Sequence, residues 1–359
     1  MSLDGGSRRE RQGSRRRRAA TLAMLVGLAL ARAARAEGLP VFDPVSPPAE
    51  SIRDLFFLVL AISAGILVVV GGMLLYCIVR FRSRACAGER DAEPPQLYGS
   101  GPIEVAWTVG PVLIVFVLFL VVIRTVFDVR PSDMPENALH VRVISHQWWW
   151  EFEYPQSGVR TANELHVPVS DADQARAVVL ELESADVVHS FWVPQLAGKT
   201  DLIPGHKNTM WFEAQQAGVY HGQCAEFCGT QHANMLIRVI AQPANEFQAW
   251  LDDQRQNAAD DAKLDDAERA GKQVFLAKTC VNCHTIRGTP AHGTVGPDLT
   301  HLASRETLAA GVLKNNREQL AKWLADPQAT DMKPGCNMPD LQLTSYEIAN
   351  LVSYLESLK

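Results

Sequence analysis

A twelve-residue stretch from Cys224 to Met235 concentrates side chains that bind soft metal ions. It supplies two thiols, an imidazole, a thioether and a carboxylate at short spacings: Cys224, Glu226, Cys228, His232 and Met235. Thiolate, imidazole and thioether are the ligands of copper electron-transfer sites, where an axial methionine tunes the potential. Two cysteines in one loop favour more than one copper, because each thiolate can bridge two ions. A zinc loop and a Cys224–Cys228 disulfide are the alternatives, although zinc rarely takes methionine.

A site built from one loop alone would be crowded, so a further imidazole is expected from elsewhere in the chain. The best candidate is His189, in the segment 186–194. A lone histidine in a strand is more often packed or exposed than a ligand. Spacing therefore leaves four competitors open: His146, His166, His206 and His221.

A second group of chemically active residues is Cys280-Val-Asn-Cys283-His284. C-x-x-C-H is the attachment signature of c-type haem, in which two thiols bind the vinyl groups and the histidine binds iron. A thioredoxin-like redox pair and half of a zinc site are the alternatives. No βαβ pattern surrounds the motif and no second C-x-x-C follows it, so both fit poorly.

Covalent haem needs a second axial ligand, and methionine is a common one. Met338, which precedes Pro339, lies 54 residues after His284, and Met332 competes with it. Ligation by Met and His raises the potential of the iron. Trp323 is a candidate for contact with a haem propionate, or simply for core packing.

Two uncharged runs, 55–79 and 105–123, are each long enough to cross the ~30 Å hydrocarbon core of a bilayer. The loop between them carries several arginines, which the positive-inside rule places in the cytoplasm: Arg80, Arg82, Arg84 and Arg90. We therefore expect a membrane hairpin, with everything after Arg124 on the outer side.

The first 36 residues read as a secretory signal. Four arginines at 15–18 precede an apolar run of 13 residues and an Ala-x-Ala site at 34–36. A first membrane helix is the alternative, but the run is too short to span. This segment holds nine arginines against two acids, so the rest of the chain carries a net charge of −13. That balance argues against nucleic acid and suits a cationic partner.

Residues 139–242 alternate between apolar and polar positions in short runs separated by turn residues, which predicts an all-β sandwich or barrel. The copper loop joins its last two strands. A closing helix is expected at 243–251, and a linker that tolerates motion at 252–266. Further helices are predicted at 267–276, 317–324 and 345–358.

Glu104 stands at the cytoplasmic edge of the second span, three residues before Trp107-Thr108. A carboxylate at a membrane boundary is either a solvated helix end or a point of proton uptake. The residue types alone favour the solvated end.

Three motifs occur in the order found in a known family. They are Cys-Ala-Glu-Phe-Cys-Gly-x-x-His-x-x-Met, Val-His-Ser-Phe-x-Val-Pro, and the run from His146 to Tyr154 with its three tryptophans. Over residues ~50–250 the chain resembles subunit II of the haem-copper cytochrome c oxidases. The resemblance implies a cupredoxin-like domain with a dinuclear CuA centre. The C-terminal part resembles a class I cytochrome c.

For the copper centre, the resemblance implies that Cys224 and Cys228 bridge the two ions and that His189 and His232 bind one ion each. Met235 and the carbonyl of Glu226 would be weaker ligands. The carboxylate of Glu226 resembles the family's ligand to a Mg²⁺ or Mn²⁺ ion shared with subunit I.

The resemblance also implies roles for four other residues. Trp148 would receive electrons and Trp150 would face the next subunit. Glu104 would stand at the mouth of a proton channel. In the segment 296–299, the carbonyl of Pro297 would orient the haem histidine.

We therefore expect a multidomain membrane protein with a two-helix transmembrane hairpin, an all-β cupredoxin-like Greek-key domain and an all-α cytochrome c domain. The expected divisions are a signal peptide (1–36), the hairpin (37–130), the CuA domain (131–251), the linker (252–266) and the cytochrome c domain (267–359).

The expected function is electron input to a proton-pumping terminal oxidase that reduces oxygen to water in subunit I. Electrons would pass from a c-type cytochrome or a reductase complex to covalent haem c, and then to CuA. Subunit I, subunit III and membrane lipid are the expected partners, with no nucleic acid. The expected location is the bacterial inner membrane, with both redox domains on the periplasmic side.

Three alternatives remain. Quinol oxidase subunits should lack the copper ligands, and nitrous oxide reductase should carry a large catalytic domain before the copper loop. A free membrane-anchored electron relay or copper carrier would need no partner subunit.

Overall fold

The computed structural model describes residues 39–82, 96, 98–130, 134–135, 137–170, 176–258 and 260–359. The predicted signal segment, residues 1–36, lies outside these residues, and so do Arg84 and Arg90.

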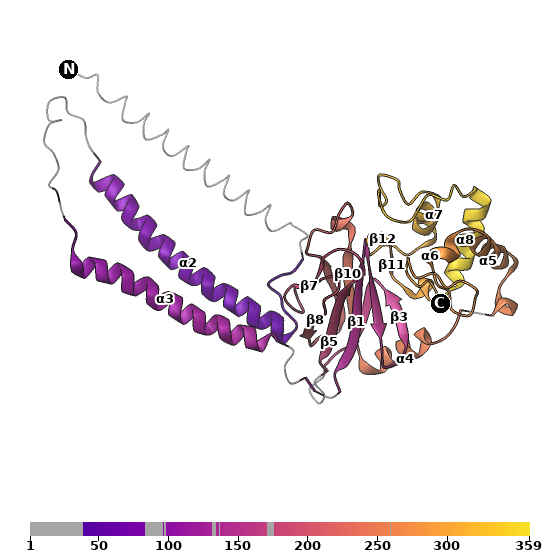
Figure 1. The fold of residues 1–359 in the computed structure, drawn as a ribbon, viewed down its shortest axis with the longest axis horizontal. Coiled ribbons are helices and arrows are strands. Elements are labelled where there is room, and N and C mark those ends of the chain that lie inside the picture. Colours follow the sequence, from indigo (N-terminus) through magenta and orange to yellow (C-terminus); the bar gives the residue numbers. More distant parts are fainter. Residues whose placement is uncertain are drawn as a thin grey trace, which may run out of the picture. The chain divides into compact units, whose positions relative to one another are not determined.

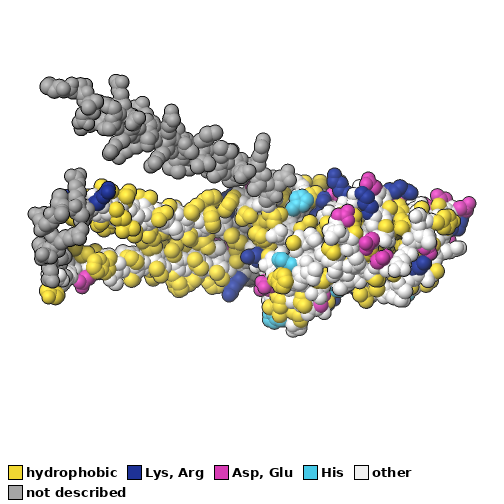
Figure 2. Space-filling model, turned by 90° about the horizontal axis from the view of Figure 1, so that it is seen from above, with side chains coloured by type: hydrophobic (Ala, Val, Ile, Leu, Met, Phe, Trp, Pro, Cys, Tyr) yellow, Lys and Arg dark blue, Asp and Glu magenta, His cyan; other side chains and the backbone are white. Residues whose placement is uncertain are grey.

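Two long helices carry apolar side chains around their whole circumference. They are α2 (Pro47–Arg80) and α3 (Gly101–Asp128), and the predicted spans 55–79 and 105–123 lie within them. At 1.5 Å per residue, 34 residues reach about 50 Å, more than the bilayer core requires. Figure 2 shows hydrophobic side chains covering both helices. Both are long and apolar enough to cross a membrane.

The central domain is a sandwich of two five-stranded sheets (Figure 1). The first has the order β3-β2-β1-β5-β8 and the second the order β4-β10-β9-β6-β7. The strands are β1 (Leu139–His146), β2 (Trp149–Tyr154), β3 (Val159–Ala162), β4 (Glu164–Pro168), β5 (Val178–Ser184), β6 (His189–Trp192), β7 (Thr200–Leu202), β8 (Asn208–Phe212), β9 (Gly218–Cys224) and β10 (Leu236–Gln242).

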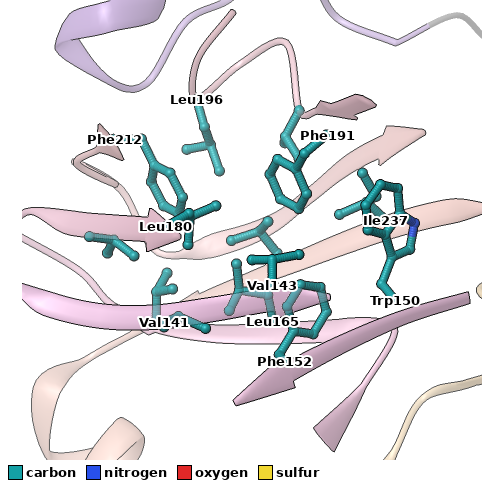
Figure 3. Packing of buried hydrophobic residues seen from close by; sticks show 14 of the residues in the cluster. Val141, Val143, Trp150, Phe152, Leu165, Leu180, Phe191, Leu196, Phe212 and Ile237 are labelled. Atoms are coloured by element: carbon teal, nitrogen blue, oxygen red, sulfur yellow. The ribbon is translucent and has the colours of Figure 1, made fainter. Parts of the chain in front are cut away.

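Alternation along the strands fills the space between the sheets. Every second residue of β10 is buried, as the period of two requires for a strand with one covered face. Figure 3 shows side chains of both sheets meeting in one core, among them Val143, Phe152, Leu180 and Ile237. The sandwich thus gives a rigid end from which the β9–β10 loop projects its ligands.

Helix α4 (Ala244–Gln254) follows the sandwich and runs three residues beyond the predicted closing helix. The segment after it was expected to tolerate motion, but it is bonded to the C-terminal domain. The carbonyl of Gln256 accepts from His301 Nε2 at 3.0 Å, and Ala258 N donates to the Arg287 carbonyl at 3.1 Å. The first three residues of the expected linker belong to α4, and the residues after them make backbone contacts that composition does not reveal.

The C-terminal domain contains α5 (Asp266–Ala277), α6 (Cys280–Cys283), α7 (Arg317–Ala325), α8 (Ser345–Ser357) and the short pair β11 (Thr307–Leu308) and β12 (Leu313–Lys314). Helices α5 and α8 both start with capping boxes, built on Asp265 and Thr344. They cross at Gly271, where a Cβ atom would lie 2.0 Å from the Asn350 carbonyl oxygen. This close crossing fixes the frame that holds the C-x-x-C-H motif.

Candidate metal and haem centres

The residues of the predicted copper site lie together at one end of the sandwich. The Cys224 Sγ and Cys228 Sγ atoms are 3.8 Å apart, with the His189 Nδ1 atom 3.8 Å from Cys224 and the His232 Nδ1 atom 3.6 Å from Cys228. The Met235 Sδ atom lies 3.9 Å from Cys228 Sγ. Each thiol therefore has its own imidazole beside it.

Strand geometry explains how residues far apart in the chain meet. Cys224 ends β9, His189 begins β6, and Met235 precedes β10. Phe191 pairs with Cys224 across the sheet, which places the two strand ends side by side. The backbone carbonyl of Glu226 completes the cluster, 3.2 Å from Cys224 Sγ.

The competing histidines are engaged elsewhere or exposed. The His146 ring stacks on Trp149, with its Nε2 atom 3.0 Å from Glu151. His166 stacks on Trp250. His206 and His221 are exposed, and among the described residues the one cluster of three metal-binding groups is His189, Cys224 and Cys228.

The electrostatics of the two thiols suit a bound cation. The thiol of Cys228 and the imidazole of His189 hold the pKa of Cys224 far below its usual value, at about 3, against the opposing effect of burial. The resulting thiolate beside it, together with burial, raises the pKa of Cys228. A positive ion bound between the two thiols opposes this effect and favours the thiolate form of Cys228. Two thiolates, two imidazoles and a buried thioether fit copper better than zinc.

Asp186 orients the His189 ring. Its Oδ1 atom lies 2.9 Å from His189 Nε2, which leaves Nδ1 pointing at Cys224. The carboxylate also accepts from the backbone N–H groups of Val187 and Gln147, both at 2.6 Å. Burial lowers the pKa of His189, but the contacts with Asp186 and Cys224 outweigh it and the net direction is upward. A carboxylate behind a ligating histidine fixes its tautomer and raises its basicity.

The C-x-x-C-H motif lines an apolar cavity in the C-terminal domain. Cys280, Cys283 and His284 face it together with Met338 and several leucines. The His284 Nδ1 atom lies 2.8 Å from the Pro297 carbonyl, so Nδ1 is the protonated nitrogen and Nε2 is free to bind iron. Burial lowers the pKa of His284 and keeps the ring neutral. A Cβ atom at Gly296 would lie 2.6 Å from this ring, so glycine is required there.

The loop around Met338 is held by Gln328. Its Nε2 atom donates to the carbonyls of Met338 at 2.6 Å and Cys336 at 2.8 Å. The competing Met332 is buried but does not line the cavity, whereas Trp323 and Cys336 do. Two thiols, an imidazole and a thioether in one apolar pocket fit covalent haem with axial His and Met ligands.

Trp148 contacts both centres. Its indole Nε1 donates to the Cys228 carbonyl at 2.9 Å, and Trp148 is also one of the residues that line the cavity of the C-x-x-C-H motif. Only 9% of its surface is exposed.

The position of Trp150 differs from the expected one. It is fully buried in the sandwich core, near Phe191 and Ile237 (Figure 3). Its ring lies edge-on to the rings of His189 and Phe191. The expectation that Trp150 faces another subunit is wrong, because strand alternation turns its side chain inward.

Comparison with known proteins covers most of the chain. Models of the cytochrome c oxidase subunit II transmembrane domain, its periplasmic domain and cytochrome c match residues 34–124, 139–242 and 268–359. The cytochrome c oxidase subunit 2 of Alkalihalophilus pseudofirmus is 35% identical over 329 residues, 90% of this chain and 92% of that protein. The chain belongs to the cytochrome c oxidase subunit II family.

Other members of the subunit II family are similar over smaller parts. The subunit 2 of a Bacillus species (strain PS3) is 36% identical over 296 residues, 78% of this chain and 80% of that protein. The periplasmic domain of the Bradyrhizobium japonicum subunit is 30% identical and covers 33% of this chain and 94% of that structure, with a TM-score of 0.31. For a subunit II chain with these domains, the matched regions imply a CuA copper centre and a haem.

Two acidic residues expected to act in this subunit II chain lie on its surface. The Glu226 side chain is exposed beside Phe227, whose surface is 76% exposed. Glu104 is exposed in the first turn of α3, and its Oε1 atom accepts from Ser100 N at 3.2 Å. Among the described residues, Glu226 belongs to no group of three or more side chains that could hold a metal ion.

Several residues of the two centres escaped prediction from sequence. Asp186 could have been predicted as the partner of His189, since it stands three residues before that histidine and just before a strand. Gln328 and Lys333 carried none, because they bond to backbone carbonyls that leave no trace in the residue types.

Proposed function

We propose that this chain is the electron-input subunit of a proton-pumping terminal oxidase. It would take electrons from a c-type cytochrome or a reductase complex at covalent haem c, and deliver them through dinuclear CuA to subunit I. Oxygen would be reduced to water in subunit I, since this chain offers the electron path and not the oxygen site.

The observation that carries the proposal is the double contact of Trp148. One residue bonds through its indole to the carbonyl of Cys228 in the copper cluster and also lines the haem cavity. Because Trp148 is almost completely covered, an external donor would reach it less readily than the attached cytochrome domain does. This favours the order haem first and copper second.

The chain's own residues would hold both groups, which supply one-electron redox chemistry when bound. Cys280 and Cys283 would anchor the haem, with His284 and Met338 as axial ligands and Pro297 orienting the histidine. The copper ligands would be His189, Cys224, Cys228, His232, Met235 and the carbonyl of Glu226. Buried, pre-oriented ligands limit the rearrangement that accompanies a change of charge.

The partner contacts belong to the same proposal. The exposed carboxylate of Glu226 would bind a Mg²⁺ ion together with subunit I, and Glu104 would take up protons at the membrane edge. Subunit III and lipid would complete the assembly in the bacterial inner membrane. The sandwich and the cytochrome domain would lie on the periplasmic side. The domain boundaries would fall at 36, 130 and 266, with the boundary expected at 251 moved to the end of α4 at Gln254.

The test is purification from the native membrane in mild detergent, followed by rapid mixing with a reduced c-type cytochrome. We expect oxygen consumption to co-purify with the chain, and haem absorbance to change before the copper band. A chain that purifies alone with no oxygen consumption would favour a free electron relay and overturn the proposal.

A further inference from the structure

The two redox domains meet through buried polar contacts that involve Trp148 directly. Lys333, from the segment that leads to Met338, is 4% exposed, and its Nζ atom donates to the Trp148 carbonyl at 2.8 Å and the Ala309 carbonyl at 3.2 Å. Four residues later in the same segment, Asn337 Nδ2 donates to the carbonyl of Gln147, the residue before Trp148, at 2.8 Å. The segment 333–338, which contains the expected haem ligand Met338, is thus bonded to the backbone of Gln147 and Trp148.

A second buried polar contact joins the same two domains at residues 306–310. The carboxylate of Glu164, 1% exposed at the start of β4, accepts from Thr307 N at 2.9 Å and Thr307 Oγ1 at 2.6 Å. It also accepts from Glu306 N at 3.1 Å. Leu236 N, beside the copper ligand Met235, donates to the Ala310 carbonyl at 3.1 Å.

The buried ammonium group is costly, and that cost indicates a specific role. Among the described residues no carboxylate pairs with Lys333, and burial lowers its pKa to about 8. An apolar side chain of similar length would avoid this cost, but it could not bridge two carbonyls from different domains. Lys333 is the one side chain that bonds both to Trp148 and to the β11–β12 segment of the cytochrome domain within the described structure.

We propose that Lys333 is a positioning residue for electron transfer between the domains: by bonding to the Trp148 carbonyl it fixes the haem-ligand segment against the indole that contacts Cys228, while Glu164 anchors the neighbouring residues Glu306 and Thr307. The inference rests on the proposed function. In this transfer one electron leaves the reduced haem and reduces the copper centre, with no bond made or broken and no proton moved.

The experiment uses the full chain in its oxidase complex. Lys333→Met keeps the length of the side chain and removes its donors, and Lys322→Met is the matched control, an exposed lysine of the same domain that pairs with Glu318. A light-activated reductant delivers one electron to the haem, and the haem-to-copper rate is read optically. For Lys333→Met we expect a rate at least roughly tenfold lower, equivalent to ~1.4 kcal/mol. The copper EPR signal and the haem spectrum should stay unchanged.

Hydrogen–deuterium exchange gives a readout that does not depend on electron flow. The backbone around Trp148 and around residues 333–338 should exchange faster in Lys333→Met and not in Lys322→Met. Glu164→Gln provides a second variant in case Lys333→Met folds poorly. Its rate should fall roughly threefold, since one amide oxygen can still accept.

The outcomes separate the two claims. If electrons do not pass from haem to copper in the unaltered chain, the proposed function fails. If they do pass, and Lys333→Met transfers them as fast as Lys322→Met, the electron path stands and the positioning role is overturned.

Discussion

Asp186 offers a sharp test of how the copper ligands are held. In Asp186→Asn the shape of the side chain is kept, but one oxygen becomes an NH₂ group and the negative charge is lost. In the unaltered chain, the Asp186 carboxylate accepts from His189 Nε2 and from the N–H groups of Val187 and Gln147. The amide has one acceptor oxygen for these contacts, so at least one donor is left facing another donor.

The size of the effect follows from this geometry. Loss of a carboxylate behind a ligating histidine typically lowers metal affinity about 10–100-fold, or ~1.4–2.8 kcal/mol. Because protons compete with copper for the two thiolates, we expect copper to leave the weakened site of the variant more easily as pH falls. The His189 ring also loses the partner that fixes its tautomer, which further lowers the copper affinity of the variant.

The assay is competition between the protein and a copper chelator, followed by the mixed-valence EPR signal. Asp201→Asn, which alters an exposed carboxylate on β7, serves as the control and should retain copper like the unaltered chain. Equal copper affinity in Asp186→Asn and Asp201→Asn would refute the claim that Asp186 holds His189 for the metal.

Three further predictions separate the parts of the chain. Cys224→Ser should abolish the mixed-valence copper signal and leave haem c intact; persistence of that signal contradicts the bridging role. His284→Ala should change the haem spectrum while copper EPR survives, and equal damage to copper would show that the centres are not independent. Burial lowers the pKa of His166 to about 4. The unfolded chain therefore binds this proton first, so stability should be complete above pH ~6.5 and decline toward pH 4, by at most about 3 kcal/mol. In His166→Gln the free energy of unfolding, measured in urea, should depend less on pH between 6.5 and 4. An unchanged pH dependence contradicts the role given to His166.

Much of the copper centre was predictable because its ligands are local. Cys224, Cys228, His232 and Met235 occupy one loop, so their spacing alone places them within reach of one ion. The β9–β10 connection and the C-x-x-C-H motif were likewise visible in the residue types. His189 was the best candidate among five histidines, but spacing alone left the other four open and the resemblance to a known family was needed to choose it.

Other features depend on contacts between residues far apart in the chain. The direction of Trp150 depends on which face of β2 turns inward, and three successive tryptophans do not reveal that face. The contact of Lys333 with Trp148 spans 185 residues and ends on a backbone carbonyl. The length of α4 was underestimated because its last turn is polar.

The burial of Trp150 also weakens one argument for a partner subunit, since a buried side chain cannot contact one. The residues that still indicate a partner subunit are Glu104, Glu226 and the exposed Phe227. They lie on surfaces that a neighbouring subunit could cover.

The central claim is that one chain holds a dinuclear copper centre and a covalent haem. The most direct measurement is metal and haem analysis of residues 139–359 produced without the membrane helices and without other subunits. We expect two coppers and one covalent haem per chain, with a mixed-valence copper EPR signal. A single zinc or a single copper per chain, or haem that is removed by acid extraction, would contradict the account.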